Sequence, residues 1–132
     1  MSTKSVADKL LIKANTTVWP SNRSHLRLLG PLPEGVRVVA EPGKATTALV
    51  FAEDAASLRK ILKTHKDQLA RPDILWVAYP KGNRADINRD TVWPVLAEYG
   101  MRPTAQVSVD EVWSGLRFRP TRKGEAPFTG GR

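Results

Sequence analysis

The side chains best suited to binding a ligand follow apolar runs of the chain, where strands of a sheet are expected to end. Ser21, Asn22, Arg23 and Ser24 follow the first of these runs and supply hydroxyl, amide and guanidinium groups. At the start of a helix, free backbone N–H groups would add further donors for an anion. The alternative is that Ser24 only caps the helix and Arg23 lies in solvent. Both interpretations stay open.

The segment 17–24 contains no glycine, although a dinucleotide or adenosyl site normally needs glycine after the first strand. Glycine permits the tight turn there and lets backbone N–H groups approach the ligand closely. Trp19 and Pro20 instead supply a bulky ring and a fixed φ, and Pro20 removes one donor. The composition therefore argues against a standard nucleotide cofactor, and no cofactor is predicted.

Polar residues also follow two later apolar runs. Glu41 follows the second run, where a Rossmann-like fold holds the carboxylate that binds ribose hydroxyls, although a solvated turn residue is the favoured interpretation. Tyr79, Lys81 and Arg84 follow the fourth run, and they form either a surface loop or a grip for a base, a phosphate or an acidic peptide. The candidate ligand-binding residues are Trp19, Ser21, Asn22, Arg23, Ser24, Glu41, Tyr79, Lys81 and Arg84.

Groups suited to catalysis are scarce in the sequence. The chain has no cysteine, which excludes thiolate nucleophiles and cysteine-based metal sites. His25 and His65 are the two histidines, and His65 extends an apolar helical stripe, which favours a packing role. Asp110 and Glu111 are expected to alternate faces of a strand and so cannot act as a carboxylate pair. No catalytic residue and no metal site are predicted, and a protein without enzymatic activity is favoured.

Apolar runs alternate with helical patterns, which predicts an α/β sheet with right-handed crossovers and helices on both faces. Strands are expected at 16–19, 36–40, 48–52 and 74–79, and helices after Ser24, after Asp54 and over 91–99. Two alternating runs, 104–112 and 116–119, predict a final antiparallel hairpin with its turn at 113–115. Ligands of such a sheet bind at the carboxyl ends of the strands. This rim comprises 19–24, 41–44, 53–54 and 79–84.

This order of elements, a mostly parallel sheet that ends in an antiparallel hairpin, resembles the fold of S-adenosylmethionine-dependent methyltransferases over residues 16–119. Three segments also resemble a small bacterial family of unknown function, numbered 3052. They are LPEGV at 32–36, LWVAYPK at 75–81 and VDEVWSGLRF at 109–118, of which the last is the most specific. The resemblance implies a Rossmann-like domain and brings no established activity or catalytic residue.

Charge and length describe one basic domain. The net charge is +8, and half of it lies in 117–132, where five basic residues accompany one acidic residue. A short basic tail is more typical of a solvated terminus than of a nucleic-acid arm. We expect flexible termini at 1–8 and 120–132 around a single domain at 9–119. No signal peptide or membrane span is recognised, so a cytoplasmic location without membrane contact is expected.

Three functions are compatible with the sequence. It favours a non-catalytic Rossmann-like module that binds a partner protein or a small anionic ligand at the strand-end rim. The first alternative is an atypical S-adenosylmethionine-dependent methyltransferase that lacks the glycine loop. The second is a nucleic-acid-associated protein that uses its basic rim and tail.

Overall fold

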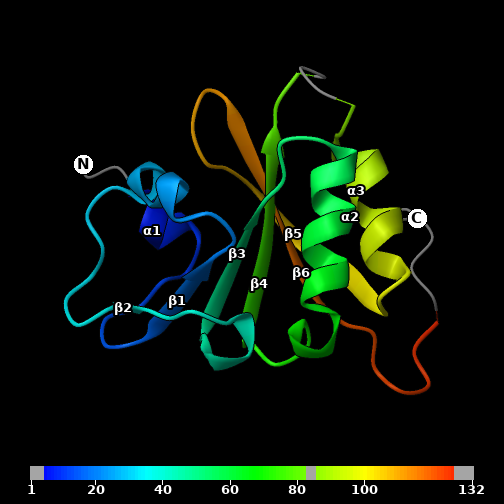
Figure 1. Cartoon of the computed structure of the whole chain (residues 1–132), viewed down its shortest axis with the longest axis horizontal. Helices are drawn as coiled ribbons and strands as arrows, with labels where there is room; N and C mark the ends of the chain where they lie inside the picture. Colours follow the sequence, from blue (N-terminus) through cyan, green and yellow to red (C-terminus); the bar gives the residue numbers. More distant parts are fainter. Residues whose placement is uncertain (1–4, 83–85, 127–132) are drawn as a thin grey trace.

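A single mixed sheet organises the molecule, seen in a computed structural model that describes residues 5–82 and 86–126 (Figure 1). The strand order is β2-β1-β3-β4-β6-β5. β1 to β4 run parallel, whereas β6 runs antiparallel to both β4 and β5. The strands are β1 (Thr17–Pro20), β2 (Arg37–Val38), β3 (Thr47–Phe51), β4 (Ile74–Pro80), β5 (Met101–Ser108) and β6 (Trp113–Pro120).

Helices cover both faces of this sheet. α2 and α3 pack on one face, and α1 and the 3-10 helix η1 pack on the other. The helices are α1 (Val6–Lys9), η1 (Arg23–Leu29), η2 (Pro42–Lys44), α2 (Ala55–Thr64), η3 (Lys66–Gln68) and α3 (Arg89–Ala97). The predicted fold class, a mostly parallel Rossmann-like sheet with a C-terminal antiparallel hairpin, is confirmed.

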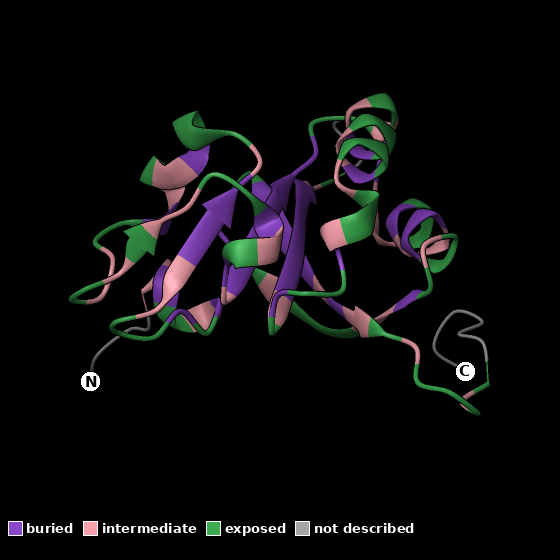
Figure 2. Cartoon of the chain, turned by 60° about the horizontal axis from the view of Figure 1, so that its bottom comes forward, coloured by how far each residue is buried: buried purple, intermediate pink, exposed green. Residues whose placement is uncertain are grey.

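The centre of the sheet is buried (Figure 2), and its two faces are apolar, as the continuous apolar runs of β3 and β4 predict. Val50 and Val77 point into the core under α2 and α3, while Leu49 and Trp76 point into the core under α1 and η1. The buried Trp76 indole also donates a hydrogen bond of 2.9 Å to the Leu10 carbonyl. Trp76 therefore fixes the C-terminal end of α1 to the middle of the sheet.

Local signals locate some elements correctly and others only roughly. The Asp54 side chain accepts a hydrogen bond of 2.7 Å from Ser57 N, so the predicted start of α2 is confirmed. The helix predicted after Ser24 is the 3-10 helix η1. Asn22, and not Ser24, caps it, because the Asn22 side chain accepts hydrogen bonds from the Ser24 backbone N–H and from the Ser24 hydroxyl. The strand predicted at 36–40 shrinks to Arg37–Val38, because only these two residues have ladder partners in β1.

The predicted hairpin exists, but its predicted turn at 113–115 is wrong. Ser114 and Gly115 lie inside β6, where they pair with Tyr79 and Ala78 of β4. The chain turns earlier because the Asp110 carboxylate accepts hydrogen bonds of 2.8 and 2.7 Å from Val112 N and Trp113 N. A side chain that binds the backbone two or three residues ahead is a strong turn former. Asp110 and Glu111 thus lie in the turn and not on a strand.

The two segments predicted as flexible termini contain residues that contact the domain. Ala7 of α1 lies within the predicted terminus 1–8, yet it is buried between the sheet and η1. In the C-terminal segment, Glu125 accepts hydrogen bonds of 2.9 and 2.6 Å from the Arg119 guanidinium and forms an ion pair with Arg102. The packed part of the chain therefore extends beyond 9–119 on both sides.

Because of these contacts, Glu125 contributes to the stability of the fold in a way that depends on pH. Hydrogen bonds from Arg119, and then from the Arg122 backbone, lower the pKa of Glu125 from 4.5 to about 2. A carboxyl group with a lowered pKa stabilises the fold above its unfolded-state value and loses that effect as the pH falls. We expect Glu125→Gln to lower the urea midpoint at pH 7 and to lower it much less near pH 2, where about half of the folded-state carboxyl groups are protonated. An equal difference at both pH values would contradict this expectation, and Glu111→Gln serves as the exposed control.

Two residues with left-handed backbone lead us to expect substitutions that change the free energy of unfolding in opposite directions. Leu11 ends α1 at φ 64° and is 36% exposed, so a side chain occupies a conformation that favours glycine. Gly100 has φ 76°, and a Cβ added there would meet no atom within 4 Å. We expect Leu11→Gly to raise and Gly100→Ala to lower the free energy of unfolding, each by about 1 kcal/mol. Urea denaturation measures both, and changes of the same sign would refute the backbone explanation.

Candidate functional site

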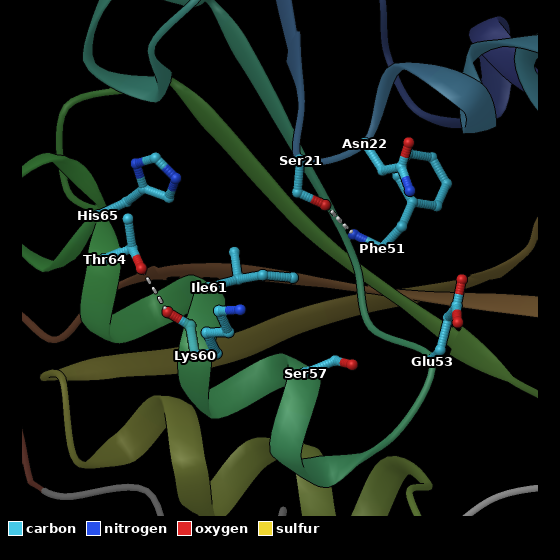
Figure 3. A pocket seen from close by; sticks show the side chains of 9 residues that line it. All are labelled: Ser21, Asn22, Phe51, Glu53, Ser57, Lys60, Ile61, Thr64 and His65. Carbon is cyan, nitrogen blue, oxygen red and sulfur yellow. Dashed lines mark hydrogen bonds between the residues drawn. The ribbon is translucent and has the colours of Figure 1, made fainter.

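A cavity of about 340 Å³ opens where the strand order of the sheet reverses (Figure 3). β1 lies between β2 and β3, and the chain leaves β1 through η1 on one face and leaves β3 through α2 on the other. Open α/β sheets bind ligands at this switch point, outside the carboxyl ends of the strands. The cavity is lined by Ser21, Asn22, Phe51, Glu53, Ser57, Lys60, Ile61, Thr64 and His65.

One wall of the cavity comes from α2. Because the Asp54 cap fixes the start of this helix, Ser57, Lys60 and Thr64 recur three or four residues apart on the same side of it. Figure 3 shows these side chains along one side of the cavity, with Ser21 and Asn22 across from them. His65 follows the helix, and its ring packs edge-on against Trp19 with 4.8 Å between ring centroids. The wall thus combines hydroxyl groups with one flexible cation.

The opposite wall is the segment that follows β1. Ser21 N donates to the Leu49 carbonyl, and Ser21 Oγ accepts from Phe51 N, each at 2.8 Å. These bonds extend the β1–β3 ladder past the last residue of β1. The Asn22 amide oxygen caps η1, while its amide nitrogen has no partner in the described part of the chain. Ser21 N–H and Phe51 N–H are therefore occupied and are not donors for a ligand on this wall.

The cavity carries one charge of each sign among its lining residues. Glu53 follows β3 and is 66% exposed, and Lys60 projects from α2. Phe51 and Ile61 add apolar surface between them. An arrangement of one carboxylate, one ammonium group and several hydroxyls suits a ligand that carries both charges and hydrogen-bonding hydroxyl groups.

A buried histidine lies behind Glu53. The His25 ring sits 4.7 Å from the Phe51 ring and 5.1 Å from the Trp113 ring, measured between centroids. Its Nε2 atom is 3.8 Å from Glu53 Oε1, and its Nδ1 atom is buried without a hydrogen-bond partner. Burial lowers the pKa of His25, Glu53 opposes that shift, and Arg27 adds to it. The sequence does not single out His25, because its burial depends on two distant aromatic residues.

Of the ligand-binding residues predicted at and after the end of the first strand, some line the cavity and others do not. Ser21 and Asn22 line the cavity. Trp19 is buried in the core beneath α2 and reaches the cavity only through its contact with His65. Arg23 and Ser24 are exposed on η1 and do not line it. The prediction of an anion site at 21–24 thus retains two of its side chains, without the guanidinium.

The other candidates lie away from the cavity. Glu41 is exposed beside η2 and forms an ion pair of 3.6 Å with Lys44. Tyr79 is buried, its hydroxyl accepts a hydrogen bond of 3.1 Å from the Gln106 side chain, and burial raises its pKa. Lys81 donates to the Ser108 hydroxyl of the hairpin, and Arg84 lies outside the described residues. Tyr79 and Lys81 therefore bind the hairpin and do not join Ser21 and Asn22.

The lining residues that the sequence does not reveal belong mainly to α2. Glu53 lies on the predicted rim but is not among the predicted ligand-binding residues. Lys60 and Thr64 lie on the polar side of an amphipathic helix, which is the usual pattern of a solvated surface. Only the packing of α2 beside β1 makes that side the wall of a cavity. No local signal distinguishes the two situations.

The described residues contain neither a membrane-spanning helix nor a cluster of metal-binding side chains. No described helix is long and apolar enough to cross a membrane. Across 5–82 and 86–126, no group of three or more histidine, aspartate or glutamate side chains is placed to hold a metal ion. The switch-point cavity is one site that the described residues offer for a small ligand.

Comparisons with known proteins bear on the fold. No protein-family model matches the chain, and no curated protein does so significantly, so the resemblance to family 3052 stays a prediction. Similar structures include a protein of the NADB-Rossmann superfamily from Streptococcus agalactiae, with a TM-score of 0.59 and 13% identity. The match covers 98% of this chain and 72% of that one.

Two further similar structures are described as tRNA methyltransferases. One is a putative tRNA (m1A22) methyltransferase from Streptococcus pneumoniae, with a TM-score of 0.59 and 11% identity over 95% of this chain and 70% of that one. The other is the M1A22 tRNA methyltransferase of B. subtilis, with a TM-score of 0.55 and 11% identity over 96% and 71%. At this level of identity the match concerns the fold alone. The chain has a Rossmann-like fold of the kind found in these methyltransferases.

Proposed function

We propose that the chain binds S-adenosylmethionine, or a closely related adenosyl compound, in the switch-point cavity and serves as a methyltransferase. The observation that carries this proposal is the position and charge of the cavity. It lies at the carboxyl ends of β1 and β3, and Glu53 and Lys60 supply opposite charges to it. The similar structures support the proposal, because one of them was determined in complex with S-adenosyl-L-methionine.

The lining residues fit such a ligand chemically. S-adenosylmethionine carries a carboxylate, two cationic groups, two ribose hydroxyls and a flat base. Lys60 would hold the carboxylate, Glu53 would face a cationic group or the ribose hydroxyls, and Phe51 and Ile61 would contact the base. The volume of about 340 Å³ is at the lower end of the range of small-molecule sites, about 300–1,000 Å³.

The mode of binding would differ from that of a glycine-rich loop. In such a loop, free backbone N–H groups approach the ligand closely. Here Ser21 N–H and Phe51 N–H are bound to Leu49 and to Ser21 Oγ. In the proposed mode the side chains of Asn22, Glu53 and Lys60 contribute to recognition, and removing one of the two charged groups should cost much of the affinity.

When bound, S-adenosylmethionine supplies a methyl group on a sulfonium, and its transfer to a nucleophile leaves the neutral thioether S-adenosylhomocysteine. This chain's residues would bind and orient the donor. Two similar structures are described as tRNA methyltransferases, so tRNA is the first acceptor to test.

A non-catalytic module that binds a partner or a small anionic ligand is the second candidate. It is favoured by the bulky Trp19-Pro20 pair at the end of β1 and by the occupied N–H groups beside it. Nucleic-acid binding through the basic C-terminal segment has less support, because Arg119 and Arg102 share Glu125 within the fold. Donor binding and methyl transfer separate these functions.

Titration calorimetry with S-adenosylmethionine tests donor binding. We expect a dissociation constant in the micromolar range, and about tenfold weaker binding for Glu53→Gln and for Lys60→Gln, since each loses a charge-assisted contact. Glu41→Gln is the matched control, because it removes an exposed carboxylate outside the cavity. Absence of binding, or an equal loss in Glu41→Gln, would contradict the proposed site.

Transfer of a labelled methyl group from S-adenosylmethionine to bulk tRNA tests the reaction. We expect incorporation with the wild-type chain and about a tenfold lower rate with Glu53→Gln at donor concentrations below saturation. Donor binding without incorporation into tRNA, other RNA or protein would instead support the non-catalytic module.

A further inference from the structure

The buried His25 ring lies next to the candidate site, and the Glu53 carboxylate stands between the ring and the cavity. The ring does not line the cavity, but its Nε2 atom lies 3.8 Å from Glu53, the acidic residue among those that line it. The His25 side chain is 9% exposed and the Glu53 side chain 66% exposed. One partner is therefore held in place by the core, while the other reaches the ligand space.

The surroundings of the ring indicate which nitrogen carries the proton. Nδ1 is buried with no hydrogen-bond partner, and a buried N–H without an acceptor is costly. Nε2 faces the Glu53 carboxylate, which would accept or attract that proton. The neutral tautomer with the proton on Nε2 is thus favoured, and its N–H dipole points toward Glu53.

We propose that His25 is a positioning residue that sets the charge preference of the cavity: the neutral ring leaves the Glu53 charge available to a cationic ligand, and the protonated ring pairs with that carboxylate and withdraws it from the ligand. This inference rests on the proposed function for its ligand, S-adenosylmethionine. It rests on the structure for the His25–Glu53 contact itself.

The groups that face His25 favour the neutral ring at neutral pH. Phe51 and Trp113 pack against it and carry no charge. Glu53 favours protonation, Arg27 on the same 3-10 helix opposes it, and burial, the largest effect, lowers the pKa of His25. At neutral pH the Glu53 charge therefore remains available to a ligand.

Protonation would reverse this balance. An imidazolium 3.8 Å from the carboxylate would form an ion pair that competes with any cationic group of the ligand. S-adenosylmethionine carries a sulfonium that S-adenosylhomocysteine lacks. The affinity of the first compound should therefore fall more steeply with decreasing pH than that of the second.

A histidine titration by NMR tests the contact without any ligand. The chain has two histidines, so His65→Gln assigns the signals. We expect Glu53→Gln to lower the pKa of His25 further, because the attraction of the carboxylate is lost, and Glu41→Gln to leave it unchanged. An unchanged pKa of His25 in Glu53→Gln would overturn the inference.

Calorimetry at pH 7 and pH 5.5 tests the consequence, because the α-amino group of both compounds stays mostly protonated over this range. We expect S-adenosylmethionine to bind the wild-type chain at least about twofold more weakly at pH 5.5, and S-adenosylhomocysteine to change less. His25→Phe, which suits the neighbouring rings, should bind with the same affinity at both pH values. Should this variant not fold, Glu53→Gln should show the same loss of pH dependence.

The two measurements separate the inference from the proposed function. Equal wild-type affinity at both pH values, or an undiminished pH effect in both variants, would overturn the role of His25. If the NMR result holds but neither compound binds at any pH, the proposed ligand is wrong, while the His25–Glu53 coupling is supported.

Discussion

Two hydrogen bonds of Ser21 hold β1 and β3 together at the point where the chain leaves them toward opposite faces of the sheet. The geometry of the site depends on this junction. Because the two strand ends are hydrogen-bonded to each other, η1 and α2 begin on opposite faces of the sheet from fixed positions. Phe51 ends β3, and Glu53 follows it two residues later. The bonds that shape the cavity also occupy two backbone N–H groups beside it, those of Ser21 and Phe51.

Local sequence signals account for much of the fold. β3 and β4 are continuous apolar runs, and Asp54 marks the start of α2, so each could be located without knowing its neighbours. The turn of the hairpin could not, because Trp113, Ser114 and Gly115 have the composition of a turn while the Asp110 carboxylate makes the actual one. The length of β2 is set by its partner strand, and that information is not local.

The site was less predictable than the fold, for a related reason. Ser21 and Asn22 could be found because they follow a strand directly. Lys60 could not, since its place in a cavity depends on how α2 packs beside β1. Glu41 follows β2 in the chain, yet it pairs with Lys44 next to η2. Sequence order locates the edge of the sheet where the cavity opens, and packing between distant elements decides which side chains meet there.

The contact between Trp76 and Leu10 has a practical consequence for spectroscopy. The Trp76 indole is 2% exposed in the middle of the sheet, and its N–H is bound to the carbonyl that closes α1. Its emission should therefore be that of a shielded indole while α1 is docked, and should shift to longer wavelength if α1 detaches. Because the chain has three other tryptophans, this shift would appear as one component of the total emission, and a gene fragment that starts after residue 9 would remove the element that shields Trp76.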